Sequence, residues 1–96
     1  MDFEPLHTKV EKTIQTTFGW IVLESINGFP RDVSNLYFIS LDGKIKWRAE
    51  KPDASSLYTR VKLNEDGETL SAYTLGDHSC ELDLRTGKLI SYTSIQ

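Results

Sequence analysis

Cysteine, histidine and long apolar runs are all scarce in this sequence of 96 residues. A single cysteine, Cys80, excludes an internal disulfide and fits a reducing compartment. No apolar run approaches the roughly 20 residues that a membrane-spanning helix needs. Residues 1–5 are acidic and lack the basic and apolar regions of a signal peptide. We therefore expect one cytoplasmic domain over residues 1–96, with residues 1–17 at its periphery.

An excess of positive charge is also absent. The chain has a net charge of −3, which disfavours nucleic acid and anionic membranes as partners. Six acidic residues and no lysine or arginine lie between Leu63 and Leu84, so the rest of the chain carries +3. This segregation predicts a negative field on one part of the surface, although an ordinary solvated face is the simpler interpretation.

Sustained helical periodicity is missing from the chain, whereas alternation of apolar and polar residues is frequent. Runs rich in aromatic and β-branched residues indicate strands over residues 19–26, 36–41, 44–50, 57–63, 69–75, 79–84 and 88–93. Residues 1–17 are ambiguous: Val10 and Ile14 have helical spacing, but Leu6, Thr8 and Val10 alternate, and the threonines favour a strand. The sequence therefore predicts an all-β fold, an antiparallel meander of about 7–8 strands that forms a sandwich or half-open barrel with little helix.

The hairpin over residues 36–50 is the best-defined unit. Asp42 and Gly43 predict a two-residue type I′ turn, in which both central residues have positive φ. In the following strand Trp47 alternates with Lys46 and other charged residues, so the indole faces the core and the cations face water. This separation disfavours a nucleic-acid surface, which needs cationic and aromatic side chains on one face.

Two later strands also alternate. In the first, one face is shared by Leu57, Thr59, Val61 and Leu63. In the second, Cys80, Leu82 and Leu84 lie opposite Ser79, Glu81 and Asp83. Each strand is therefore expected to have a buried and a solvated face.

One cluster, residues 77–81, is worth testing as an active site. His78 and Cys80 are two apart on a strand and share a face, so a thiolate–imidazole pair or two metal ligands are conceivable. Cys80 also alternates with Leu82, which favours a small buried core residue. A metal would need two further ligands, and His7 is the only other histidine. We therefore expect no catalytic residue, no metal and no cofactor.

Glu24 is the one acidic residue inside an apolar strand. It shares a parity with Trp20 and Val22, so it fits either an inward position or a position at a sheet edge, and the edge is the simpler. The sequence has no phosphate loop, nucleotide fingerprint or nucleophile elbow. The chain is therefore not expected to be an enzyme.

Two hairpins share a signature. Residues 37–47 (Tyr-Phe-Ile-Ser-Leu-Asp-Gly-Lys-Ile-Lys-Trp) resemble the strand-turn-strand repeat of quinoprotein-type β-propellers, and residues 82–90 resemble its Asp-x-x-Thr-Gly-Lys variant. A propeller needs several four-stranded blades, and this chain has strands for about two, so neither a closed propeller nor the cofactor of its central channel is expected. Small free-standing bacterial proteins with this pattern are similar to immunity proteins encoded beside contact-dependent or polymorphic toxins. The resemblance is one of pattern and size, and it assigns no site residue.

The resemblance and the charge pattern together imply an immunity protein that neutralises a cognate bacterial toxin, most simply a nuclease, by covering its active site with an acidic surface. The expected interface residues are Glu65, Asp66, Glu68, Asp77, Glu81 and Asp83, with Tyr73 or Tyr92 as an aromatic anchor. The alternative is a structural or adaptor module that pairs through sheet edges, including self-association. A small enzyme or ligand carrier is the third hypothesis. The expected partner is thus a protein, and the isolated chain is expected to be a monomer or dimer.

Overall fold

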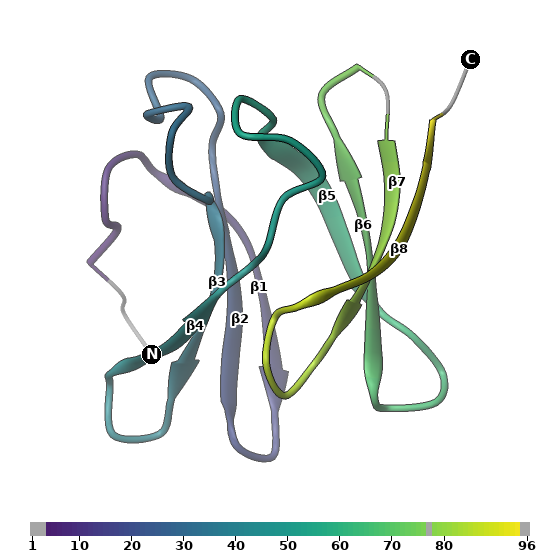
Figure 1. The fold of residues 1–96 in the computed structure, drawn as a ribbon. Helices are drawn as coiled ribbons and strands as arrows, with labels where there is room; N and C mark the ends of the chain where they lie inside the picture. The colour runs from purple at the N-terminus through teal and green to yellow at the C-terminus, as the bar shows by residue number, and fades with distance from the viewer. Residues whose placement is uncertain (1–3, 77, 95–96) are drawn as a thin grey trace.

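The computed structural model describes residues 4–76 and 78–94, which form eight antiparallel β-strands and no helix (Figure 1). The strands are β1 (Val10–Thr16), β2 (Gly19–Glu24), β3 (Leu36–Ser40), β4 (Ile45–Arg48), β5 (Tyr58–Leu63), β6 (Thr69–Thr74), β7 (His78–Asp83) and β8 (Leu89–Ser94). The first four form one meander, sheet A, and the last four form a second, sheet B. The predicted all-β fold is thereby confirmed, and its eight strands form two open sheets, as in a sandwich or half-open barrel.

The strand boundaries agree closely with the sequence pattern. All seven strands predicted beyond residue 17 form, each within two residues of the expected ends. The ambiguous N-terminal segment forms a strand, β1, over residues 10–16. Within the described ranges, no helix is long and apolar enough to cross a membrane.

The turn between β3 and β4 is not the predicted type I′. Gly43 has a φ of 85°, whereas Asp42 does not have a positive φ. The Gly43 N–H donates to the Ser40 carbonyl and the Ser40 N–H to the Lys44 carbonyl, both at 2.9 Å, so the loop has three residues with glycine in the left-handed position. Asp42 accepts hydrogen bonds from the Ser40 hydroxyl and the Lys44 N–H. The aspartate therefore serves as an acceptor in the turn and needs no left-handed backbone.

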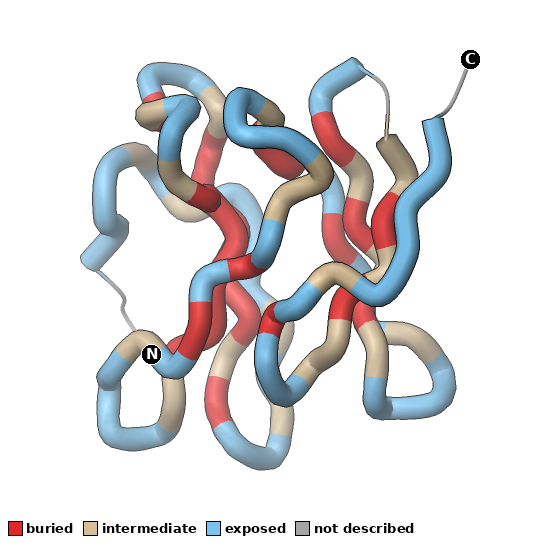
Figure 2. The backbone as a smooth tube through the Cα atoms, viewed as in Figure 1, coloured by how far each residue is buried: buried red, intermediate tan, exposed pale blue. Residues whose placement is uncertain are grey.

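The two sheets pack face to face around one apolar core, and Figure 2 shows their buried segments facing each other. Residues 21–49 contribute Ile21, Leu23, Leu36, Phe38, Trp47 and Ala49, and residues 58–82 contribute Tyr58, Val61, Leu70, Ala72, Cys80 and Leu82. The molecule measures 38 × 32 × 17 Å, which fits two layers that are about 10 Å apart.

Tyr58 lies in this core, which corrects the strict alternation predicted for β5. The register shifts between Tyr58, which pairs with Thr74, and Arg60, so Thr59 is an extra residue in the ladder. This bulge turns Tyr58 inward, where it is fully buried, and its hydroxyl donates to the Glu50 carbonyl at 2.5 Å. Burial also raises the pKa of Tyr58, which keeps the hydroxyl protonated as a donor.

Asn35, at the position before β3, joins the two sheets through a fully buried side chain. Its Nδ2 donates to the carbonyls of Glu24 at 2.8 Å and Tyr58 at 2.7 Å, and its Oδ1 accepts the Tyr58 N–H at 2.8 Å. The amide acts as an extra peptide group inserted between sheet A and β5. Because these groups are buried, removing the amide would leave them without partners.

Trp47 and Gly87 form a second link between the sheets. The Trp47 Nε1 donates to the Leu84 carbonyl at 2.9 Å, and the indole stacks on Phe38 with ring centroids 5.7 Å apart. A Cβ on Gly87 would lie 2.4 Å from the indole, so only glycine allows this approach. The Gly87 carbonyl also accepts the Glu50 N–H at 2.8 Å. The turn after β7 is thereby fixed against the end of β4.

Glu24 fastens the N-terminal segment to sheet A. Its fully buried carboxylate accepts the N–H groups of Leu6 at 2.6 Å, His7 at 3.0 Å and Thr8 at 2.9 Å, and the Tyr37 hydroxyl also donates to it. The edge position favoured from the sequence is wrong, because β2 is a central strand and residues 6–8 wrap over its end.

Candidate functional site

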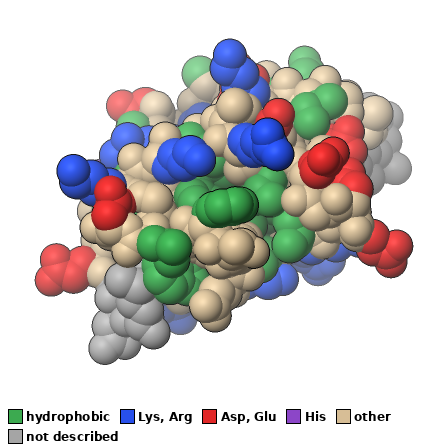
Figure 3. Space-filling model, turned by 90° about the horizontal axis from the view of Figure 1, so that it is seen from below, with side chains coloured by type: hydrophobic (Ala, Val, Ile, Leu, Met, Phe, Trp, Pro, Cys, Tyr) green, Lys and Arg blue, Asp and Glu red, His purple; other side chains and the backbone are tan. Residues whose placement is uncertain are grey.

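The β1–β2, β3–β4, β5–β6 and β7–β8 turns all lie at one end of the sandwich, at the bottom of Figure 1. Between the sheets at this end is a hollow of about 600 Å³, which we call the groove. Phe18, in the β1–β2 turn, and Phe38, on β3, line it from sheet A. Leu63, at the end of β5, and Leu84, in the β7–β8 turn, line it from sheet B. Figure 3 shows apolar side chains gathered in the middle of this end, with cationic and acidic side chains around them.

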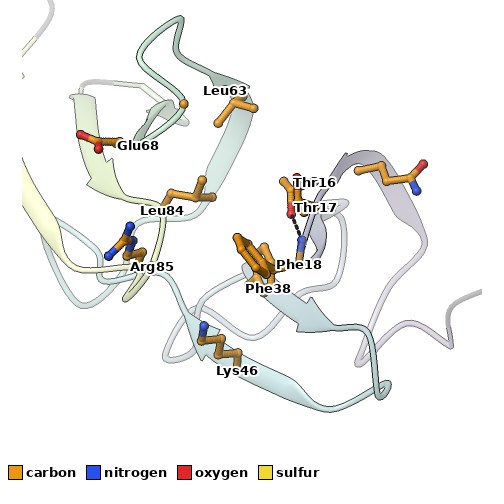
Figure 4. Close-up of a pocket in the computed structure, with 11 residues that line it drawn as sticks. Thr16, Thr17, Phe18, Phe38, Lys46, Leu63, Glu68, Leu84 and Arg85 are labelled. Atoms are coloured by element: carbon orange, nitrogen blue, oxygen red, sulfur yellow. Dashed lines mark hydrogen bonds between the residues drawn. The ribbon is translucent and has the colours of Figure 1, made fainter.

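Phe18 is 72% exposed, the largest value among the large hydrophobic side chains of the described residues. It lies in the tight turn between Thr16 and Gly19, which face each other across the β1–β2 ladder. The Thr16 hydroxyl donates to the Gly19 carbonyl at 3.0 Å and accepts the Phe18 N–H at 3.3 Å. In Figure 4 the ring lies beside Phe38, across the groove from Leu84. The turn thus presents an aromatic ring to solvent on a backbone that is already ordered.

The groove has an apolar interior and a charged rim. Phe38 is only 4% exposed, and Leu84 is half-buried. Lys46 and Arg85 bring positive charge to the rim, and Glu68 brings negative charge. An apolar centre with a polar rim is the arrangement of protein–protein interfaces.

Four of the acidic residues predicted at the interface lie at this same end. Glu65, Asp66 and Glu68 belong to the β5–β6 turn, and Asp83 ends β7. Glu68 and Asp83 line a small hollow together with Arg85, whose cation interrupts the acidic surface. The structure therefore gathers these acids beside the groove, but with a cation among them.

Asp66 and Asp83 also hold their own turns. Asp66 accepts the Glu68 N–H at 2.8 Å, a bond that holds the pKa of Asp66 below its usual value. Asp83 accepts the Arg85 N–H at 2.7 Å. These two aspartates thus contribute to the fold, whereas Glu65 and Glu68 are exposed acids that can meet a partner without loss of a turn.

The other predicted interface residues lie elsewhere. Tyr73 and Glu81 are on the outer face of sheet B, where Tyr73 pairs directly with Arg60. Tyr92 lies on β8 and is 50% exposed. Asp77 lies outside the described residues. The predicted set is therefore divided between the groove end and sheet B.

The residues considered for catalysis are held by packing. Cys80 is 3% exposed in the core, and burial raises the pKa of its thiol, which disfavours the nucleophilic thiolate. The His78 ring contacts the Thr74 hydroxyl at 3.4 Å and packs edge-to-face on Tyr92 with centroids 5.4 Å apart. Across residues 4–76 and 78–94, no three His, Cys, Asp or Glu side chains gather as metal ligands would.

Comparison with known proteins gives no identification. No protein-family model, curated protein or solved structure matches this chain. The groove is therefore interpreted from its own chemistry.

Phe18 was not among the residues predicted at the interface. Its signal was an aromatic residue between Thr17 and Gly19, where turns usually have polar residues. Because residues 1–17 fitted both helix and strand, the turn itself could not be located, and its aromatic residue did not stand out.

Proposed function

We propose that this chain is a protein-binding domain that holds its partner at the groove end, with Phe18 as the anchor. The observation that carries the proposal is the 72% exposure of this ring, beside an apolar groove of about 600 Å³. Interface energy concentrates in aromatic anchors that a partner buries. A partner that covers Phe18 and places an apolar side chain in the groove removes both apolar surfaces from water.

The partner class that we propose is the toxin of a bacterial toxin–immunity pair, with a nuclease as the simplest case. Support comes from the size of the chain, its propeller-like hairpins and the acidic residues Glu65 and Glu68 of the β5–β6 turn, of which Glu68 lines the groove. A nuclease binds its anionic substrate in a cationic cleft, which these acids attract during association. Inhibition then needs no chemistry, because the bound domain occupies the space of the nucleic acid.

The function is tested by co-expressing the chain with the nuclease domains encoded by neighbouring genes and counting surviving colonies. We expect protection by the native chain, and loss of protection by Phe18→Ser, because truncating an aromatic anchor costs about 2 kcal/mol, or about 30-fold in Kd. The matched control is Leu75→Ser, which removes a 55% exposed apolar side chain from the opposite end. Failure of the native chain to protect rejects the toxin as partner; equal protection by Phe18→Ser rejects the groove.

The role of the acidic turn is tested separately by the double variant Glu65→Gln, Glu68→Gln, which keeps Asp66 and hence the turn. At low salt we expect association with the toxin to slow by about 5-fold to 10-fold while dissociation changes little. Glu4→Gln with Glu11→Gln removes the same charge from exposed positions elsewhere. Equal effects of the two double variants would show that net charge, and not the turn, controls association.

A further inference from the structure

The two open sheets have four edge strands: β1 and β4 in sheet A, β5 and β8 in sheet B. Edge strands carry unpaired backbone groups that can accept a further strand, and proteins protect them with charges, prolines or covering contacts. Three of the four contain charged residues, namely Glu11 and Lys12 in β1, Lys46 and Arg48 in β4, and Arg60 and Lys62 in β5. The Lys12 Nζ also donates to the Val61 carbonyl at 3.0 Å, which covers part of the β5 edge.

β8 has no charge and no proline of its own, and the Glu50 carboxylate, which accepts the Leu89 N–H at 2.8 Å, covers the first residue of the strand. Its sequence, Leu-Ile-Ser-Tyr-Thr-Ser, contains no charge and no proline and is rich in residues that favour strands. Every residue after Leu89 is exposed, including Ile90 at 52% and Tyr92 at 50%. In Figure 1 the strand forms the border of sheet B, and no strand of the described residues pairs with its outer side.

We propose that β8 pairs antiparallel with β8 of a second copy, so that the two B sheets join across a two-fold axis. Such an axis requires an edge that is complementary to itself, and a neutral strand meets no like-charge repulsion from its copy. The β4 and β5 edges carry only cations and would place like charges near the axis, whereas β1 carries one acid and one base.

The pairing of β8 with β7 shows which part of β8 is regular enough to pair with a second copy. From Ser91 to Ser94 the β7–β8 ladder is regular, whereas Ile90 is an extra residue at a bulge. A two-fold axis at Tyr92, within this regular stretch, places Tyr92 opposite Tyr92 of the second copy and Ser91 opposite Thr93. Two aromatic side chains directly opposite each other on antiparallel strands stabilise the pairing. The contact covers one strand edge, so a weak dimer is expected, with Kd on the order of 100 µM.

The proposal is tested by sedimentation equilibrium between about 10 µM and 1 mM. The native chain is expected to rise from 10.9 kDa toward twice this mass. The double variant Ser91→Lys, Thr93→Lys places like charges opposite each other twice, and so does Ser91→Glu, Thr93→Glu. Both positions are exposed and pair with the outward-facing Glu81 and Ser79, so the core is unaffected. Each variant alone is expected to remain at 10.9 kDa, and an equimolar mixture to dimerise again.

The matched control is Thr13→Lys with Asn27→Lys, which adds the same charge at exposed positions away from β8 and should dimerise like the native chain. A native chain that stays monomeric to about 1 mM overturns the proposal. So does a dimer that the lysine pair on β8 weakens no more than the control. Because Phe18 is not at this edge, Phe18→Ser should dimerise normally, so the dimer and the groove are tested independently.

Discussion

Replacing Glu24 by glutamine is expected to release the N-terminal segment and destabilise the fold. In the native chain Oε1 accepts hydrogen bonds from the N–H groups of His7 and Thr8. Oε2 accepts hydrogen bonds from the Leu6 N–H and from the Tyr37 hydroxyl. Glutamine replaces one acceptor oxygen by an NH₂ donor. In either orientation of the amide, at least one backbone N–H of residues 6–8 then faces another donor.

The magnitude follows from the number of bonds that are lost. A buried donor without a partner costs about 1–3 kcal/mol, and hydrogen bonds to a charged acceptor are stronger than those to a neutral one. We therefore expect Glu24→Gln to lower the free energy of unfolding by about 2–3 kcal/mol. For a domain of this length that corresponds to a fall in Tm of about 10–20 °C.

The same site makes stability depend on pH. Burial alone would raise the pKa of Glu24, but the hydrogen bonds from Thr8, Tyr37, Leu6 and His7 together outweigh it and hold the pKa below the usual 4.5. The carboxylate therefore stabilises the fold fully above the unfolded pKa of about 4.5, and this contribution is lost as pH falls through the lower folded value. The stability difference between the native chain and Glu24→Gln should be constant near neutral pH and shrink in acid.

Urea unfolding at pH 7 and in acid measures both effects, and hydrogen exchange of the amides of residues 6–8 reports local release of the segment. Tyr37→Phe is the control, because it removes one donor and keeps the three backbone bonds, at an expected cost of about 1 kcal/mol. A free energy of unfolding for Glu24→Gln within about 0.5 kcal/mol of the native value at pH 7 would contradict this role of Glu24, and so would a difference that persists unchanged in acid.

Three further variants or reactions test the core. Asn35→Ala removes three buried hydrogen bonds and should lower the free energy of unfolding in urea by about 3–4 kcal/mol; a loss below 1 kcal/mol would contradict its role between the sheets. Gly87→Ala places a Cβ 2.4 Å from the Trp47 ring and should cost about 1–3 kcal/mol with a shift in tryptophan fluorescence, whereas the neighbouring exposed Thr86→Ala should leave the fluorescence unchanged. The buried Cys80 thiol should react with a thiol reagent at pH 8 about 100-fold more slowly in the native chain than in urea, and equal rates would show that it is accessible.

Strand identity was predictable because it depends on local alternation and on turn residues. In β7, Cys80 and Leu82 are buried as the pattern required. The inward position of Tyr58 was not predictable, since it arises from a bulge in the pairing with β6. The burial of Glu24 depends on residues 6–8, which are 16 to 18 positions away from it in the sequence. No local sequence pattern predicts this contact.

The candidate site was predictable only where its residues are neighbours in the chain. Glu65, Asp66 and Glu68 share one turn, so their proximity follows from the sequence. That Glu68 lines the same groove as Phe18 depends on how sheet A packs on sheet B, which alternation within single strands does not determine. The same limit applies to Arg85, whose position beside Glu68 interrupts the acidic surface.

The placement of four turns at one end of the sandwich has a consequence for how such a chain can diversify. The bonds made by Glu24 and Asn35 lie at the opposite end, so the tips of the turns can change in length and composition without disturbing them. A library confined to residues 17–18, 41, 65, 68 and 85, which keeps Asp42, Asp66 and Gly67, should therefore yield folded chains with new partners. The scaffold would then evolve as antibody frameworks do, with recognition varied at one end and folding conserved at the other.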